Sequence, residues 1–333
     1  MYQAQFKTLS PLTHGTENPK DKPSELPAGV KDNYSVILKL PVSYQGETEY
    51  FPAVSGNSLR GIFRRIGAEI TLTELGLTVF DIPKNVYYLL FSGGALRDKI
   101  KIYIRNQLTI RAALPQASLF GAAYGKAIVE GHLIVHDMIP ITPETNFITG
   151  LKTTAFFKPS MIGFRLMTCH PQDLPSDLDE DEGESPSIFH QEMVYPGVPF
   201  AHSFDFKPGI NVVEKSLMGE IIRRFSANPR VGGGLSRGFG HLGVESPYTD
   251  LDSLGSFDIY RDYIQENKEI IIEYIRHLED ETLLKVKVKK ATVDEDGDTE
   301  KKIKKPTKFA DWKSLGSIDD ALEALSKTYH FMS

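Results

Sequence analysis

The sequence predicts an α+β fold, because strand-like and helix-like patterns follow one another along the chain up to about residue 250. Alternating apolar and polar residues indicate strands at 2–10, 33–42, 131–141 and 192–206. Apolar residues at helical spacing indicate helices at 58–70 and 213–227. We therefore expect neither a doubly wound parallel sheet nor an all-helical core.

The stretches between these elements are less regular. Residues 71–110 form a mixed α/β region with β-rich apolar runs at 86–91 and 101–110, and residues 118–125 (SLFGAAYG) indicate a compact turn. Residues 142–192 are interpreted as an insertion that projects from the core. Within it we expect a strand pair, 153–157 with 161–167, and in the tail we expect a helix at 256–279, a Lys-rich hairpin at 285–305 and a helix at 318–327.

Composition places the chain among ordinary globular proteins. Its net charge of -6 comes from one tract, because residues 172–184 hold seven acids and no Lys or Arg. Charge therefore neither requires nor excludes a nucleic-acid partner. Cys169 is the only cysteine, which fits a reducing, cytoplasmic environment. We find no signal peptide and no apolar run long enough to span a membrane, so we expect no membrane partner.

The first predicted helix combines a polar start, an apolar stripe and a basic face. Ser55, Asn57 and Ser58 can cap its first N–H groups. The stripe consists of Leu59, Ile62, Phe63, Ile66 and Ile70, and the basic face of Arg60, Arg64 and Arg65. Because a helix N-terminus carries partial positive charge, this arrangement predicts a phosphate-binding helix. A solvated basic face with no ligand is the alternative.

A second candidate site is the glycine-rich stretch from Arg230 to Val244, which has six glycines in fifteen residues. Dense glycine allows a ligand to approach the backbone closely, and the basic and polar side chains can donate to phosphates. The predicted binding residues are Arg230, Gly232, Gly233, Gly234, Ser236, Arg237, Phe239 and His241. A purely structural glycine turn is the alternative.

The sequence also contains partial matches to several enzyme motifs, but the residues around them do not fit the corresponding sites. Pro247 stands where a dinucleotide-binding helix would begin, which disfavours a dinucleotide site. Residues 121–127 (GAAYGKA) partly match the phosphate-binding (Walker A) loop of nucleoside-triphosphate enzymes. They have one residue too few between the glycines, and Ala127 replaces the Ser or Thr whose hydroxyl binds magnesium. His132 and His136 share one face of the predicted strand, where an ordinary core or surface pair is favoured over a metal site. We expect no metal and no cofactor.

Taken in order, the motifs resemble those of the RAMP superfamily of CRISPR-associated proteins, specifically the backbone subunit that coats the guide RNA. The residues that carry the resemblance are the helix start Ser55–Gly61, the Leu-Phe-Gly turn Leu119–Gly121 and the loop Gly233–Gly240. Asn57 departs from the family pattern, in which this position is a serine. The resemblance covers residues 1–245, and the type IV branch is the first choice, ahead of type I or type III.

The resemblance implies a ferredoxin-like (RRM-like) palm at 1–250 with an inserted thumb at 142–192 and a web, followed by a C-terminal extension at 251–333. A thumb of this kind would displace a base of the bound RNA at regular intervals. Its predicted wedge residues are Phe156, Phe157, Lys158, Met161, Phe164 and Arg165, and a small satellite core is the alternative. The implied partners are crRNA, further copies of the chain, other CRISPR effector subunits and a complementary DNA or RNA target.

Two other functions stay open at this point. One is a RAMP ribonuclease, either guide-processing or target-cleaving, in which Asp21 or Asp32 in the loop after the first strand would act in strand scission. The other is an unrelated α/β nucleotide enzyme. We expect no catalysis, because Lys20, Lys22 and Lys31 accompany those acids in a proline-rich loop, a composition typical of solvated loop charges.

Overall fold

The computed structural model describes residues 1–15, 34–96, 104–125, 127–151, 161–169, 187–278 and 315–332. These divide into two compact units. Unit 1 comprises 1–62, 134–205 and 223–250, and unit 2 comprises 63–133, 206–222 and 251–333. The helices in the described part of the chain are too short or too polar to cross a bilayer.

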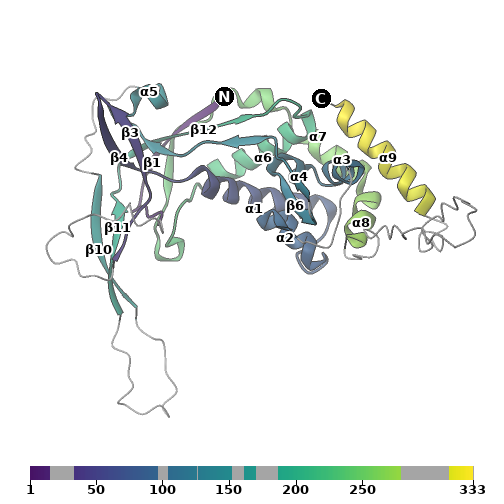
Figure 1. Cartoon of the computed structure of the whole chain (residues 1–333), viewed down its shortest axis with the longest axis horizontal. Helices are drawn as coiled ribbons and strands as arrows, with labels where there is room; N and C mark the ends of the chain where they lie inside the picture. The colour runs from purple at the N-terminus through teal and green to yellow at the C-terminus, as the bar shows by residue number, and fades with distance from the viewer. Residues whose placement is uncertain are drawn as a thin grey trace, which may run out of the picture. The chain divides into compact units, whose positions relative to one another are not determined.

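The main sheet has five strands (Figure 1). They are β1 (Tyr2–Thr8), β8 (Leu133–Val135), β9 (Ile139–Pro140), β12 (Pro199–Phe206) and β13 (Leu242–Ser246). The strand order is β13-β1-β12-β8, and β9 also pairs with β12. Helix α1 (Gly56–Leu75) precedes β8 in the chain and α6 (Val212–Ala227) precedes β13. This is the β-α-β-β-α-β order of a ferredoxin-like fold, and the α+β prediction is confirmed.

The sheet buries one face of β1, whereas in β12 the consecutive residues Phe200, Ala201 and His202 are all buried. In β1, Ala4, Phe6 and Thr8 are buried while the residues between them are not, as the period of two requires. Phe6 meets Phe225 of α6 and Tyr248 edge to face, each with ring centroids 5.9 Å apart. These aromatic contacts form the core beneath the sheet in unit 1.

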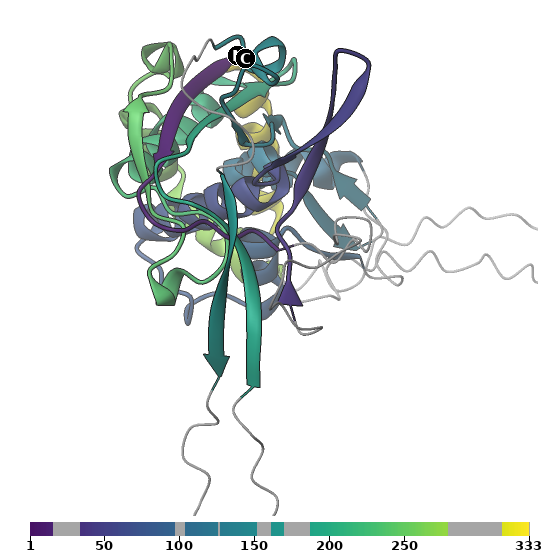
Figure 2. The same cartoon turned by 90° about the vertical axis from the view of Figure 1, so that its left-hand side faces the viewer.

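Two hairpins leave unit 1 as separate arms (Figure 2). In the first, β3 (Lys39–Tyr44) pairs with β4 (Glu47–Pro52) across Gln45 and Gly46, both of which have positive φ. In the second, β10 (Ile162–Cys169) pairs with β11 (Ser187–Val194). Short strand β2 (Tyr34–Ser35) pairs in parallel with β11.

Several expected strands differ in extent. The expected strand 33–42 is divided between β2 and β3, and the expected strand 192–206 is divided between β11 and β12, because Gly197 turns the chain with φ 96°. Strand β10, which contains 162–167, pairs with β11. Its expected partner, 153–157, lies outside the described part of the chain.

In unit 2 two predicted β-rich runs are helical. Residues 86–91 lie in α2 (Lys84–Ser92), where Val86, Leu89 and Leu90 form a buried helical stripe and Gly93 ends the helix in the left-handed conformation. Most of 101–110 lies in α3 (Ile104–Ala113). The expected turn at 118–125 is instead the end of α4 (Pro115–Phe120) followed by β6 (Ala122–Gly125).

The remaining elements of unit 2 complete a small sheet and a helical tail. Strand β6 pairs with β5 (Gly94–Leu96) and β7 (Ala127–Val129). The remaining helices of unit 2 are α7 (Asp258–Glu266), α8 (Lys268–His277) and α9 (Leu315–Phe331). Unit 1 has one further short helix, α5 (Asn146–Thr149). The expected helix at 256–279 is thus two helices, the expected helix at 318–327 is confirmed, and the Lys-rich hairpin at 285–305 lies outside the described residues.

Candidate nucleic-acid interface

The start of α1 is held by hydroxyl, imidazole and carboxylate groups. The Ser58 N–H donates to Ser55 Oγ over 3.2 Å, as the capping pattern predicts. His14 Nε2 lies 3.1 Å from the same oxygen, and the Gly56 N–H donates to Asp137 Oδ1 over 2.7 Å. A carboxylate therefore already occupies the helix N-terminus, so the phosphate-binding capacity of this region rests on its side chains.

His14 and Asp137 were not among the predicted site residues. Burial lowers the pKa of His14, and the charge of Asp137 partly offsets that effect. Both residues lie far from Ser55 in the sequence, and no spacing rule connects them to it. The sheet brings them together, because Asp137 lies between β8 and β9 and His14 follows β1.

The three arginines of α1 differ in environment. Arg65 is exposed, and Arg60 is half-buried, with burial lowering the pKa of its guanidinium. Arg64 is only 9% exposed, so the prediction that it shares a solvent-facing basic surface is wrong. Its guanidinium donates to Phe120 O over 2.8 Å and to Gly121 O over 2.9 Å. Arg64 thus stabilises the Leu-Phe-Gly segment, which places that motif in the core.

The apolar stripe of α1 is wider than predicted. Leu59, Phe63 and Ile70 are fully buried, whereas Ile62 and Ile66 are half-buried. Gly67 is buried too, and a Cβ there would lie 3.0 Å from Ile221. The close approach of neighbouring helices explains why Arg64 is enclosed.

The glycine-rich stretch forms an exposed loop on a fixed backbone. Gly232, Gly234, Gly238 and Gly240 all have positive φ, and Leu235–Arg237 form one 3₁₀ turn. Several of the loop amides donate to carbonyl oxygens of the protein, namely those of Gly233, Arg237, Gly238, Phe239 and Gly240. Its side chains, more than its amides, are therefore the groups that can reach a ligand.

Exposure separates the predicted loop residues into two groups. Gly233, Gly234, Ser236 and Arg237 are exposed, and Arg230, Gly232 and His241 are half-buried. Phe239 is 3% exposed, so it anchors the loop and is not available to a base.

One short segment, Leu9–Gly15, connects the two motifs. Gly240 N–H donates to Pro11 O over 2.8 Å, and Gly233 N–H donates to Thr13 O over 2.8 Å. Next in the chain, His14 contacts Ser55 at the start of α1. Stretches that lie more than 170 residues apart in the sequence are therefore neighbours in unit 1.

The β10–β11 hairpin reaches the same loop. The Arg165 guanidinium lies over the Phe239 ring, 5.5 Å from its centroid, and Arg165 is exposed. Phe164 is half-buried, but Met161 is fully buried and cannot serve as an exposed wedge tip. Phe156, Phe157 and Lys158 lie outside the described residues, as do Asp21 and Asp32.

Two further pairs of titratable side chains make structural contacts within the protein. His132 and His136 do not share a strand face, because both lie outside β8, and His132 Nδ1 contacts the buried Glu214 carboxylate at 2.8 Å. Lys39 Nζ binds Glu192 Oε1 at 2.7 Å, where β3 approaches β11. Across the residues that the structure describes, no group of three His, Cys, Asp or Glu side chains is placed to hold a metal ion.

The sequence matches no family model and no curated protein. Among solved structures, a chain of a "Type IV-B CRISPR Complex" is similar, with a TM-score of 0.53 and 18% sequence identity. The similarity covers 75% of this chain and 90% of that chain. At this identity the likeness shows a shared fold.

Proposed function

We propose that this chain is a subunit of a multisubunit CRISPR complex and that it coats the guide RNA as a repeated, non-enzymatic backbone subunit in the cytoplasm. The observation that carries the proposal is the junction at Leu9–Gly15, which holds the start of α1 and the glycine-rich loop together in unit 1. The fold shared with a chain of a type IV-B CRISPR complex supports the same function.

The groups at this junction suit a sequence-independent RNA contact. Ser236 and Arg237 are exposed, and Arg60, Arg230 and His241 are half-buried. Guanidinium groups bind phosphate oxygens through charge-assisted hydrogen bonds, and phosphate contacts position a strand without reading its bases. A subunit that must coat any guide sequence needs contacts of this kind.

Repetition along the guide would come from contacts between copies of the chain. The β10–β11 hairpin is the proposed thumb, and its exposed Arg165 lies against the glycine-rich loop through Phe239. Deleting 170–186 removes the residues between β10 and β11 in the chain and keeps both strands and the main sheet. We expect the shortened protein to bind RNA but to lose regular spacing along it, which nuclease footprinting would show.

Stoichiometry tests the backbone function directly. Purified protein should carry RNA, detected by the ratio of absorbance at nucleic-acid and protein wavelengths and by a denaturing gel. Several copies of the protein should bind one guide RNA. One copy per RNA would favour a guide-processing enzyme instead. Protein that carries no RNA and binds none would contradict the proposal.

We also propose that the chain lacks ribonuclease activity. The assembled complex would be incubated with a labelled complementary RNA and Mg²⁺. Uncleaved RNA is the expected result. Cleavage that disappears in Asp21→Ala or Asp32→Ala would establish the target-cleaving alternative.

A further inference from the structure

A cavity of about 300 Å³ lies in unit 1 beside the start of α1. Its polar lining includes His136, Asp137 and Ser203, and its apolar lining includes Leu40, Ile139 and Ile148. These residues come from β3, β9, α5, β12 and the β8–β9 connection. The volume is at the lower end of the range for small-molecule sites, so the cavity suits a small, flat ligand.

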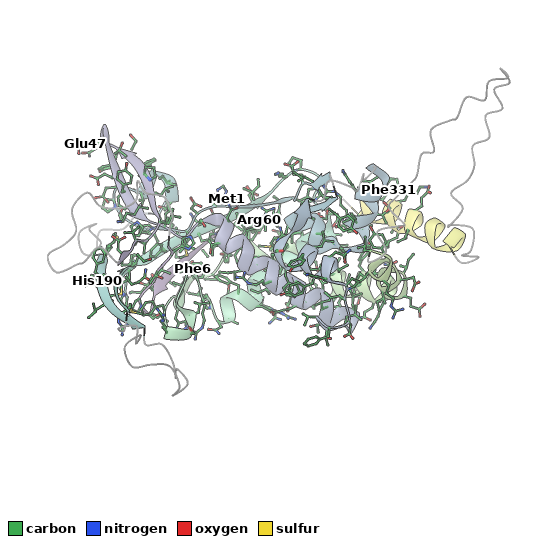
Figure 3. The ribbon with its side chains drawn as sticks, turned by 60° about the horizontal axis from the view of Figure 1, so that its bottom comes forward. Met1, Phe6, Glu47, Arg60, His190 and Phe331 are labelled. Carbon is green, nitrogen blue, oxygen red and sulfur yellow. The ribbon has the colours of Figure 1, made fainter. Side chains whose placement is uncertain are left out.

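Asp137 joins this cavity to the proposed RNA interface. Its Oδ1 accepts from Gly56 N–H, the first residue of α1, which also carries Arg60 (Figure 3). A carboxylate has about four lone-pair sites on two oxygens, so one backbone bond does not exhaust its capacity as an acceptor. A group that enters the cavity thus meets an oriented carboxylate next to the proposed path of the RNA.

The chemistry of the lining selects a class of ligand. The Asp137 carboxylate repels phosphate, which disfavours an anionic group beside it. Aliphatic side chains can enclose the faces of a ring, while Asp137 accepts from an exocyclic amine, as acidic side chains do from cytosine N4. His202, which also lines the cavity, is held neutral by burial, which lowers its pKa to about 3.

We propose that this cavity binds a nucleobase with an exocyclic amino group, and that it does so for bases of the RNA strand carried along the interface. The proposal rests on the proposed RNA-binding function and adds to it a base site outside the thumb. The base can belong to the guide or to the complementary strand, since both offer the same chemistry. A cationic side chain of a second copy would also match Asp137, but the link from Asp137 to α1 favours the base.

Two neighbouring residues of α5 provide a matched pair of variants. Ile148 lines the cavity and is 48% exposed, whereas Phe147 is 65% exposed and is not part of the lining. Ile148→Trp therefore fills the cavity, and Phe147→Trp adds the same ring outside it. Leu40→Trp, in β3, fills the cavity from a second element if Ile148→Trp fails to fold.

The first measurement uses RNA-free protein with AMP and UMP, observed by saturation-transfer NMR. We expect AMP to bind more tightly than UMP, Ile148→Trp to weaken AMP binding by about tenfold or more, and Phe147→Trp to leave it within about twofold. Equal AMP binding in both variants, or none in the wild type, would overturn the base site.

The second measurement uses RNA oligomers with one 2-aminopurine, placed in the guide or in its complement. Seating the base should raise its fluorescence at particular positions, and the strand that responds identifies the source. Ile148→Trp should abolish the rise and weaken RNA binding by about tenfold, the factor expected for AMP, while RNA still binds through its phosphate contacts. RNA binding with no responsive position would refute the base site alone, whereas loss of all RNA binding would refute the proposed function. If Ile148→Trp instead changes self-association of the RNA-free protein, a protein side chain occupies the cavity and the proposal is wrong.

Discussion

Charged side chains at two sites, one in each unit, have different surroundings. In unit 2, Arg64 donates to the carbonyls of Phe120 and Gly121, and Glu214 is fully buried against His132. In unit 1, Arg165 and Arg237 are exposed around the glycine-rich loop. Two arginines one turn apart on α1 also differ in burial, because Arg64 is almost fully enclosed whereas Arg60 is half-buried. A basic residue in a helix pattern indicates a ligand only when its surroundings leave it at the surface.

The largest expected effect comes from Arg64→Ala. Two buried carbonyl oxygens would lose a charged donor and a cavity would form, so we expect the free energy of unfolding to fall by about 3 kcal/mol. Arg60→Ala, one turn earlier, should change stability by less than about 1 kcal/mol. Urea unfolding of both variants makes the comparison. Equal losses would show that the two arginines do not differ as described.

The next effect concerns the glycine-rich loop. A Cβ at Gly240 would lie 1.9 Å from Val231 O, whereas Gly238 has nothing within 4 Å, and both have positive φ. Gly238→Ala should cost about 1 kcal/mol for the strained backbone, and Gly240→Ala should cost about 1 kcal/mol or more beyond that, because its backbone must move. Only Gly240→Ala should weaken RNA binding strongly. If the two variants behave alike, the fixed loop shape is not needed for binding.

A smaller effect depends on pH. The pKa of His202 is about 3 in the folded protein, against 6.5 for an ordinary histidine, because the side chain is fully buried. The unfolded chain therefore binds a proton between these values that the folded chain does not. The free energy of unfolding should fall by about 1.4 kcal/mol per pH unit as pH decreases below 6.5. His202→Gln should flatten this dependence in urea titrations at pH 7 and 5, and an unchanged slope would contradict the assignment.

The smallest effect concerns the link between hairpin and loop. A double-mutant cycle with Arg165→Ala and Phe239→Leu should give a coupling energy of about 0.5–1 kcal/mol for the cation–π contact. Arg165→Lys should retain part of it. A coupling near zero would show that the hairpin is not held to the loop by this pair.

Much of the main sheet and its two helices was predictable from sequence, because the strands alternate and the helices carry long apolar stripes. The strand prediction for residues 86–91 is wrong, because it rests on the strand preference of valine and tyrosine. The buried residues Val86, Leu89 and Leu90 have helical spacing and lie in α2. The Ser55 cap was recognisable from residue type. Asp137 was not, because its bond to Gly56 depends on how the β8–β9 connection meets α1.

The burial of Arg64 was equally hidden from sequence reasoning. Its acceptors are the main-chain oxygens of Phe120 and Gly121, which any residue type would supply. The glycine-rich loop was easier to recognise from sequence, because dense glycine permits the positive φ angles that four of its glycines adopt. Its neighbour in space, Leu9–Gly15, carried no signal of its own.

The salt dependence of RNA binding tests the central claim most directly. Wild type, Arg60→Ala/Arg237→Ala and the control Arg276→Ala, which removes a cation of α8 in unit 2, would be compared on single-stranded RNA over a range of salt concentrations. The double variant should bind all guide sequences more weakly, with the slope of log affinity against log salt smaller in magnitude by about 1.4, or 0.7 per lost phosphate contact. Arg276→Ala should match the wild type. Unchanged affinity and slope in the double variant would contradict the assignment of the guide backbone to α1 and the glycine-rich loop.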